Sequence, residues 1–288
     1  MSGSFTQNIS GFFLLLKPKI VMASGFSAYV GMVMAKKAPP DFFEAILLIV
    51  IIISSAAASV LMNNLLDQEI DAKMQRTKRR LETIENLGRS TLWLFSFLTV
   101  VFASFMAFIL FNTMVTVLLI CAILSYVIWY TLFLKRKSPF GAILGGLPGA
   151  LPVLIGGFAS SIDLPLDVWL FFGFMMLWQP AHFWALALKI EDEYRAAEIP
   201  VLPVSFGVHY TKLFIGIYGA SLLPVSMILA YQPGYSMMTK VASFLVGMYY
   251  ILETVYFVFF KPNYSRAFYA SLVYVMILMS VFCFDLLT

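Results

Sequence analysis

The sequence predicts an all-α, polytopic membrane protein with about nine transmembrane helices in a single domain spanning residues 1–288. Apolar residues make up 61% of the chain and charged residues 12%, whereas soluble domains are roughly 45–50% apolar and about 25% charged. The mean hydropathy is +0.90. This composition excludes a disordered chain, and the lack of a basic soluble face excludes a nucleic-acid partner. We therefore expect the chain to lie in a lipid bilayer.

Nine apolar segments approach or exceed the ~20 residues that a helix needs to cross the hydrocarbon core of a bilayer. They cover residues 20–35, 42–65, 91–111, 113–134, 139–160, 165–188, 210–231, 239–260 and 264–287. The strands of a membrane barrel are excluded because such long runs do not alternate between apolar and polar residues. An odd number of spans predicts that the two termini lie on opposite sides of the membrane.

Sixteen of the 19 Lys and Arg residues fall on one side of the predicted spans, and only Lys36, Lys37 and Lys240 fall on the other. The positive-inside rule therefore predicts that the N-terminus and two long polar loops, 66–90 and 189–209, are cytoplasmic. These loops follow the second and the sixth span. Their similar position in two groups of four helices hints at a duplicated architecture.

Asn63, Asp67 and Asp71 form an acidic stripe where the second span ends. Four residues advance a helix by about 400°, so these side chains drift by only about 40° per step. Two carboxylates one turn apart repel each other unless a cation lies between them. Mg²⁺ fits this position because it takes oxygen ligands, commonly one or two carboxylates together with substrate phosphates. Glu69 points to another side of the helix and is expected to be solvated.

A basic cluster follows the stripe directly, formed by Lys73, Arg76, Lys78, Arg79 and Arg80. Guanidinium groups neutralise phosphate oxygens through bidentate contacts, so arginines beside a metal-binding stripe suit a diphosphate. The alternative is a solvated helix extension whose basic residues only satisfy the positive-inside rule.

The loop after the sixth span contains a second acidic run, with Glu191, Asp192, Glu193 and Glu198 close together. These carboxylates could supply a second metal or orient the first. The run lacks the four-residue spacing of the stripe, and a charge run is commonly a solvated face. Both interpretations stay open from the residues alone.

The segment from Asn63 to Arg80 resembles the first signature of the UbiA superfamily of intramembrane prenyltransferases. Within that superfamily, the Asn63-Asn64 pair and the Met-x-Arg-Thr-x-x-Arg run at 74–80 look like the heme-specific branch, the protoheme IX farnesyltransferases or heme O synthases. The general superfamily pattern has Asp at the position of Asn64.

Further matches extend the resemblance over about residues 15–210. They are KPK at 17–19, YTLFLKR at 130–136, GGLPGALP at 145–152, WQPAHF at 178–183 and YRAAEIPVLPV at 194–204. The chain departs from the family pattern at Leu81, which replaces Pro, and in the second signature. There Glu193 replaces Asp, Glu198 replaces Gly and Val201 replaces Met.

The resemblance implies helices around a central cavity and transfer of a farnesyl group from farnesyl diphosphate to a vinyl group of heme B, giving heme O. It implies Mg²⁺ held by Asn63, Asp67 and Asp71, with Asp192 and Glu193 contributing to a second metal. The catalytic residues expected from it are Asn63, Asp67, Asp71, Arg76, Arg80, Lys135, Lys189, Glu193 and Tyr194.

Gln179 and His182 are polar residues inside the sixth span, where such groups are costly and tend to face a cavity or a partner. One interpretation is a packing histidine that hydrogen-bonds to a neighbouring backbone carbonyl. The resemblance instead favours contact of both residues with heme, with His182 ligating or positioning it. Glu253, in the eighth span, has no partner that the sequence identifies.

The resemblance and the chain length predict a location in the bacterial cytoplasmic (inner) membrane, with a heme A synthase or an oxidase assembly factor as partner. Two other functions compete with heme farnesylation. One is a UbiA-type transferase acting on a quinone precursor or a chlorophyll-like ring, against which the Asn64 pattern argues. The other is a secondary transporter, which would carry its charges near mid-membrane and not at the ends of the second and sixth spans.

Overall fold

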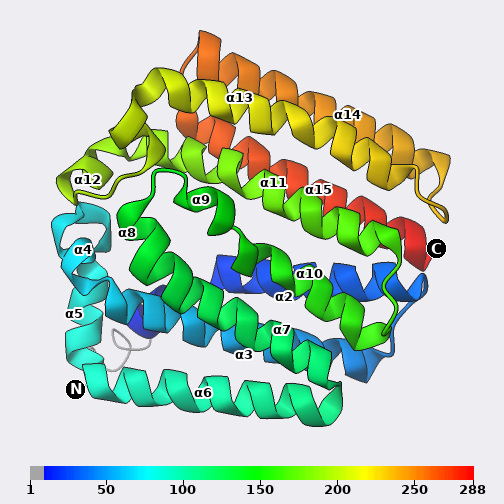
Figure 1. Ribbon diagram of the computed structural model, residues 1–288, viewed down its shortest axis with the longest axis horizontal. Helices are drawn as coiled ribbons and strands as arrows, with labels where there is room; N and C mark the ends of the chain where they lie inside the picture. Colours follow the sequence, from blue (N-terminus) through cyan, green and yellow to red (C-terminus); the bar gives the residue numbers. More distant parts are fainter. Residues whose placement is uncertain (1–9) are drawn as a thin grey trace.

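Long helices pack side by side across the whole molecule in the computed structural model, which describes residues 10–288 (Figure 1). No strand forms within these residues. The long helices are α2 (Pro18–Lys36), α3 (Phe42–Leu66), α6 (Arg89–Leu110), α7 (Thr113–Leu124) with its continuation η2 (Ser125–Leu134), α10 (Leu147–Ser160), α11 (Leu166–Lys189), α13 (Leu202–Ala230), α14 (Met237–Val255) with η3 (Tyr256–Phe260), and α15 (Tyr264–Leu287).

These elements confirm the predicted all-α membrane architecture. Eight of the described helical stretches are long and apolar enough to cross a membrane. The remaining expected span, the sixth in chain order, corresponds to α11, which is 24 residues long. It falls short in hydropathy because Gln179, Pro180 and His182 interrupt its apolar sequence.

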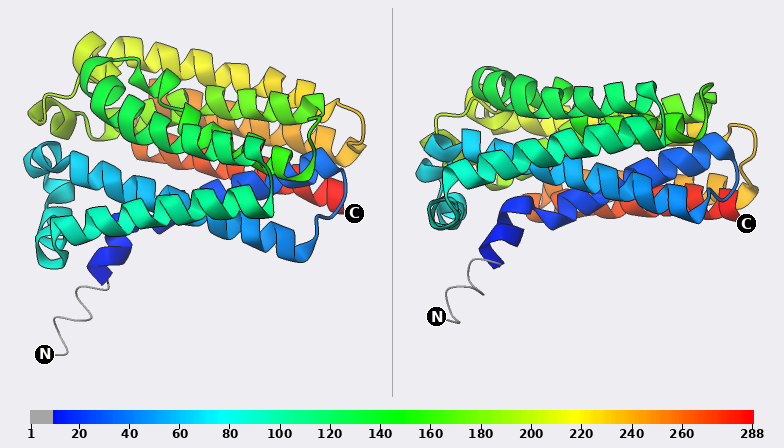
Figure 2. Two further views of the ribbon diagram at one scale, coloured as in Figure 1. Left: turned by 60° about the horizontal axis from the view of Figure 1, so that its bottom comes forward. Right: turned by 90° about the horizontal axis from the view of Figure 1, so that it is seen from below.

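Consecutive long helices pack against one another, and α15 returns to α2, so the helices form a closed ring. Short helices connect them at one end of the ring, on the left of Figure 1. These are α4 (Gln68–Lys73), η1 (Gln75–Thr77), α5 (Lys78–Leu87), α8 (Lys135–Lys137), α9 (Gly141–Leu144) and α12 (Glu191–Ala196). Figure 2 shows that the first described residues, 10–16, form a short helix that leaves the bundle at this end.

The two long polar segments are therefore mostly helical, where the sequence predicts loops. The segment 66–90 folds into α4, η1 and α5. The helix α13 begins at Leu202, earlier than the predicted 210, because Gly207 adopts φ 83° and links two helical stretches end to end. A positive φ of this kind is accessible to glycine at little cost.

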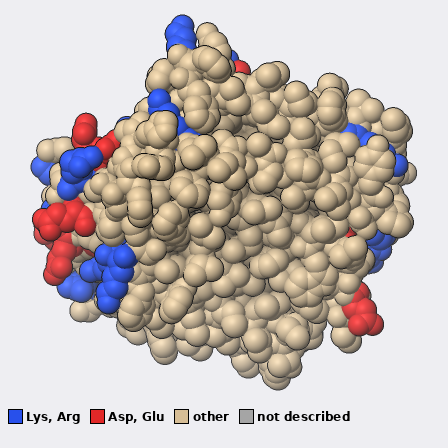
Figure 3. Space-filling view, turned by 45° about the horizontal axis from the view of Figure 1, so that its top comes forward, with Lys and Arg blue, Asp and Glu red and all other residues tan. Residues whose placement is uncertain are grey.

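Charged side chains gather at the two ends of the bundle, with an apolar band between them (Figure 3). This distribution fits a bilayer, whose hydrocarbon core disfavours charge.

At the end away from the short connecting helices, the buried Asp167 pairs with Lys37 and accepts a 2.7 Å hydrogen bond from the Tyr235 hydroxyl. The sequence identified no partner for Glu253. In the structure its carboxylate accepts two hydrogen bonds from the guanidinium of Arg266 in α15, at 2.9 and 3.2 Å.

The helices α2 and α10 touch backbone to backbone inside the ring. A Cβ atom added at Gly31 would lie 2.0 Å from the Val153 carbonyl oxygen, and one added at Gly156 would lie 1.8 Å from that of Ala28. Glycine is therefore required at both positions by the closeness of the two backbones. Small residues serve the same purpose in other packed membrane helices.

We expect Gly156→Ala to destabilise the protein by about 1–3 kcal/mol, because the added methyl group forces α2 and α10 apart. Thermal unfolding of the detergent-solubilised protein measures this loss. Gly173→Ala is the matched control, since no atom lies within 4 Å of a Cβ at that position. Equal unfolding temperatures for the two variants would contradict the close contact.

Candidate active site

A cavity of about 680 Å³ opens at the end of the bundle that carries the short connecting helices. Its wall combines the N-terminal segment with the end of α3 and with α4, α5, η2, α11 and α12. Its polar lining includes Lys17, Asn63, Asp67, Asp71, Arg76, Arg80, Tyr126, Tyr130, Lys135 and Tyr194. The structure thus brings most of the predicted site residues to one place.

The acidic stripe keeps its register although the helix breaks within it. The helix α3 ends at Leu66, and Asp67 links it to α4 with φ −95° and ψ 11°. The amide of Asp67 still donates to the Asn63 carbonyl at 2.9 Å, and that of Asp71 donates to the Asp67 carbonyl at 2.8 Å. The four-residue spacing therefore holds all three side chains on the cavity side.

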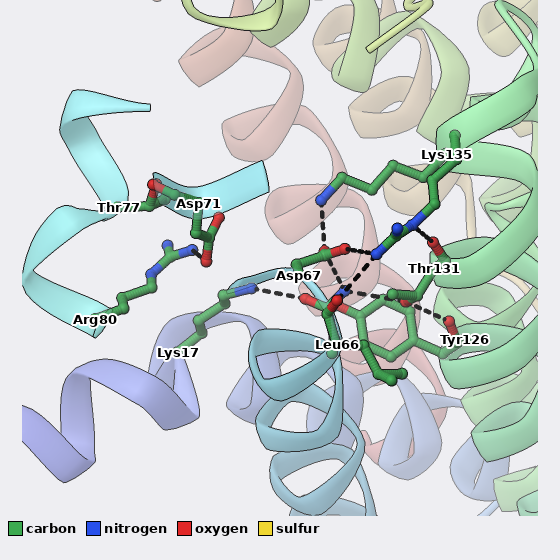
Figure 4. Close-up of polar contacts among 11 residues, drawn as sticks. Lys17, Leu66, Asp67, Asp71, Thr77, Arg80, Tyr126, Thr131 and Lys135 are labelled. Atoms are coloured by element: carbon green, nitrogen blue, oxygen red, sulfur yellow. Dashed lines mark hydrogen bonds and ion pairs between the residues drawn. The ribbon is translucent and has the colours of Figure 1, made fainter. Parts of the chain in front are cut away.

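Cations surround the two carboxylates, both of which are at least 95% buried. The ammonium of Lys135 lies 2.5 Å from Oδ2 of Asp67, and the guanidinium of Arg80 lies 3.7 Å from Oδ2 of Asp71. Lys17 donates to the side-chain oxygen of Asn63 at 3.4 Å. In Figure 4, Asp71 with Arg80 lies on one side of Lys17, and Asp67 with Lys135 lies on the other.

Burial changes the acidity of the groups in this wall. Burial, aided by the nearby positive charges of Arg80 and Lys135, lowers the pKa of Lys17 to about 7. Burial also raises the pKa of Asp71, lowers the pKa of Arg80 and raises the pKa of Tyr194 to about 12. Charges in a buried wall interact with a bound anion more strongly than the same charges do in bulk solution.

The side chains at the junction of α3 and α4 fit Mg²⁺. Asp67, Asp71 and Asn63 offer two carboxylates and an amide oxygen, and Mg²⁺ prefers such oxygen ligands. Oδ2 of Asp71 is buried and receives no hydrogen bond from the described residues. Residues 10–288 contain no group of three His, Cys, Asp or Glu side chains placed to hold a metal. Asn63, Asp67 and Asp71 would leave the remaining ligands of Mg²⁺ to water and phosphate, as is usual for this ion.

Three of the predicted catalytic and metal-binding residues do not line this cavity, and neither do Gln179 and His182, the two residues expected to contact heme. Lys189 donates to the Ser265 hydroxyl at 3.1 Å and lies over the ring of Tyr269, on the side of α15. Asp192 is exposed. Glu193 is half-buried, and its Oε2 has no hydrogen-bond partner among the described residues.

His182 lies between two aromatic rings, with its ring centre 4.5 Å from that of Trp178 and 4.4 Å from that of Phe268. Its Nδ1 lies 2.6 Å from the hydroxyl of Ser271, and that hydroxyl donates its single proton to the Phe268 carbonyl at 2.7 Å. With this hydroxyl donating to the carbonyl, Nδ1 is the donor in the contact with Ser271 and Nε2 keeps a lone pair. This is the tautomer of a histidine that binds a metal through Nε2.

A second, smaller cavity continues from the first toward the middle of the bundle. It measures about 180 Å³, and both cavities are lined by Ile20 and Tyr126. Its wall is mostly apolar, with Gln179 among the exceptions. The amide of Gln179 donates to the Gly146 carbonyl at 2.6 Å. Together the two cavities offer a charged compartment followed by an apolar one.

Arg136 is a functional residue that the sequence did not single out. Its guanidinium donates to the Leu66 carbonyl at 2.9 Å, to Oδ1 of Asp67 at 3.4 Å and to the Thr131 carbonyl at 3.3 Å. It therefore caps the end of α3 and holds one oxygen of Asp67, while the other oxygen faces Lys135. Its position next to Lys135, at the end of the family-like segment 130–136, was the signal in the sequence.

The sequence matches the model of the UbiA prenyltransferase family over residues 24–284. The protoheme IX farnesyltransferase of Geotalea uraniireducens (strain Rf4) is 37% identical over 78% of this chain and 87% of its own length. That of Aquifex aeolicus (strain VF5) is 33% identical over 96% of both chains.

Solved structures share the fold at lower identity. A digeranylgeranylglyceryl phosphate synthase superposes with a TM-score of 0.77 at 15% identity, covering 97% of this chain and 98% of the other. A UbiA homolog from Archaeoglobus fulgidus bound to DMAPP and Mg²⁺ superposes with a TM-score of 0.66 at 15% identity, covering 94% and 98%. The predicted fold class is thereby confirmed.

Proposed function

Because the chain belongs to the UbiA prenyltransferase family, we propose that it transfers a farnesyl group from farnesyl diphosphate to a vinyl group of heme B. The C–O bond to the diphosphate breaks, the farnesyl carbon bonds to the vinyl carbon, and water adds to the neighbouring carbon with loss of a proton. The products are heme O and diphosphate. The observation that carries this proposal is the pair of buried carboxylates among cations at the entrance to an apolar cavity.

The donor's diphosphate would lie in the charged cavity. Asp67, Asp71 and Asn63 would hold Mg²⁺, which when bound supplies positive charge to the departing diphosphate oxygens. Arg76 and Arg80 would neutralise the remaining charge from one side, with Lys17 and Lys135 on the other. Fixed charges that match the leaving group accelerate ionisation, since they need no rearrangement as negative charge develops.

The isoprenoid chain would extend into the smaller cavity. Its apolar wall excludes water, which would otherwise quench the allylic cation before the acceptor reacts. Tyr126 and Tyr130 stack with their ring centres 5.9 Å apart at the junction of the two cavities. Their faces are suited to a cation that forms at this point.

We assign the heme side of the reaction to α11. His182 and Gln179, three positions apart on α11, are the residues that we propose for heme contact; Gln179 lines the smaller cavity. The relatives named protoheme IX farnesyltransferase support heme as the acceptor.

We also propose a bacterial inner membrane location with the charged cavity facing the cytoplasm, supported by the positive-inside distribution of Lys and Arg. A heme A synthase or an oxidase assembly factor would then receive the product.

Purified protein tests the reaction directly. With farnesyl diphosphate, Mg²⁺ and heme B, we expect mass spectrometry to detect heme carrying a hydroxyethylfarnesyl group. A parallel reaction contains 4-hydroxybenzoate in place of heme. Prenylation of the benzoate alone would overturn the acceptor, and solute counterflow in proteoliposomes without any prenylated product would favour a transporter.

Asp67→Asn and Asp71→Asn should each lower kcat/KM by about 10²–10³-fold, since each removes a charge that acts on the leaving group. Steady-state product formation measures the loss, and circular dichroism verifies the helical fold. Glu69→Gln is the matched control, because Glu69 lies on the same short helix and is exposed. Wild-type activity in both aspartate variants would refute the proposed metal site.

His182→Ala should weaken heme B binding about tenfold or more, the usual effect of losing an oriented metal ligand. Heme titration followed by absorbance measures this change, and binding of farnesyl thiolodiphosphate should stay as in the wild type. His209→Ala, at the other and exposed histidine, provides the control. The assignment fails if both variants bind heme equally well.

A further inference from the structure

Two neighbouring asparagines at the end of α3 hold the N-terminal segment from different sides. Asn63 lines the charged cavity, and its side-chain oxygen accepts from the Lys17 ammonium at 3.4 Å. Asn64 lies about 100° further round the helix, is buried, and does not line that cavity. Its side-chain amide donates to the backbone carbonyl of Leu15 at 2.7 Å. Asn64 therefore contacts the chain two positions before Lys17, outside the cavity lining.

The hydrogen bond from Asn64 lies close to a break between two helices. Residues 10–16 are helical, and α2 begins at Pro18. Lys17, between them, adopts φ 49° and ψ 61°. Such left-handed values are unfavourable for a residue with a Cβ atom, and they persist only where surrounding contacts fix them. The backbone on both sides of Lys17 therefore needs contacts that hold it.

Contacts of this kind are present on both sides of the turn. After it, the Lys17 carbonyl accepts from the amides of Ile20 and Val21, at 3.0 and 3.3 Å, where α2 starts. Before it, the carbonyl of Leu15 would accept from an amide four positions later if the first helix continued. The left-handed turn interrupts that helix, and Asn64 supplies a donor instead.

Burial makes the hydrogen bond from Asn64 hard to replace. The Leu15 side chain is fully buried, in a hydrophobic cluster with Leu61 and Leu65 of α3. Asn64 itself is 1% exposed, so water has little access to this contact. A buried carbonyl that loses its donor is strongly destabilised, because no water takes the place of the donor. We therefore expect the segment around Leu15 to shift when the amide of Asn64 is removed.

The turn determines where the charge of Lys17 lies. In Figure 4, Lys17 extends between Asp71 and Asp67. We propose that Asn64 is a positioning residue for donor binding: it holds the Leu15 carbonyl, which fixes the turn at Lys17 and so keeps the ammonium in the charged cavity. This inference rests on the proposed function, since it takes the diphosphate of the donor as the group that Lys17 binds.

Asn64→Leu removes the amide donor while keeping a side chain of similar size. With Mg²⁺ and without heme, we expect this variant to bind the donor analogue farnesyl thiolodiphosphate about tenfold more weakly, the usual effect of losing a hydrogen bond to a charged group. Isothermal titration calorimetry of the detergent-solubilised protein measures the affinity. Hydrogen–deuterium exchange in peptides that cover residues 12–22 should become faster, because the turn is no longer fixed.

A double-mutant cycle separates positioning from general destabilisation. Lys17→Met should itself weaken binding of the analogue about tenfold or more, since it removes the charge. In the Lys17→Met protein, the further change Asn64→Leu should alter the affinity by less than about twofold, because Asn64 acts through a charge that is already absent. Independent effects would instead multiply, to about 100-fold for the double variant.

Asn112→Leu is the matched control. The side-chain amide of Asn112 donates to the Phe158 carbonyl at 2.8 Å, a bond of the same kind that joins the start of α7 to α10, away from the charged cavity. Its loss should lower the thermal unfolding temperature and leave the affinity for the analogue at the wild-type value. Asn64→Ala removes the same donor without adding bulk, and it provides the test should Asn64→Leu not fold.

Wild-type affinity in a folded Asn64 variant would overturn the proposal, as would multiplied losses in the double variant. Weaker binding of the analogue that disappears in the Lys17→Met background supports it even if heme B gives no product, because the binding assay contains no acceptor. Failure of the wild type to bind the analogue would overturn this inference together with the proposed function.

Discussion

The burial of two carboxylates at the end of one helix is the constraint on which the rest of this structure depends. Asp67 and Asp71 are almost without contact with water, and a buried charge without a partner is strongly destabilising. Lys135 and Arg80 supply the partners, from α8 and α5. These ion pairs hold the short helices α5 and α8 against the two carboxylates.

The same constraint explains why the end of the bundle is irregular. In a regular continuation of α3, the Leu66 carbonyl would accept a backbone hydrogen bond from the next turn of the helix. Because the helix ends at Leu66, this carbonyl accepts instead from Arg136. The segment η2 is a π-helix, and the hydroxyl of Thr131 within it donates to the Tyr126 carbonyl at 2.8 Å and accepts from the Asn63 amide at 3.0 Å. Stretches of this kind often mark functional sites.

Much of the fold follows from sequence because hydropathy and length decide which segments can cross a bilayer. The acidic stripe also follows, since the four-residue spacing of Asn63, Asp67 and Asp71 fixes them to one face whatever the helix packs against. The direction in which Lys189 points, the pairing of Glu253 with Arg266 and the capping role of Arg136 depend on which helices become neighbours. Each of these contacts joins residues of different helices, so hydropathy and helix length do not specify it.

The charged cavity has a consequence for the order of events in the proposed reaction. The cations that would hold the diphosphate of the donor, Lys17, Arg76, Arg80 and Lys135, are the same groups that would hold free diphosphate. Free diphosphate would therefore compete with the donor for one binding site, and each turnover would require its release before another donor binds.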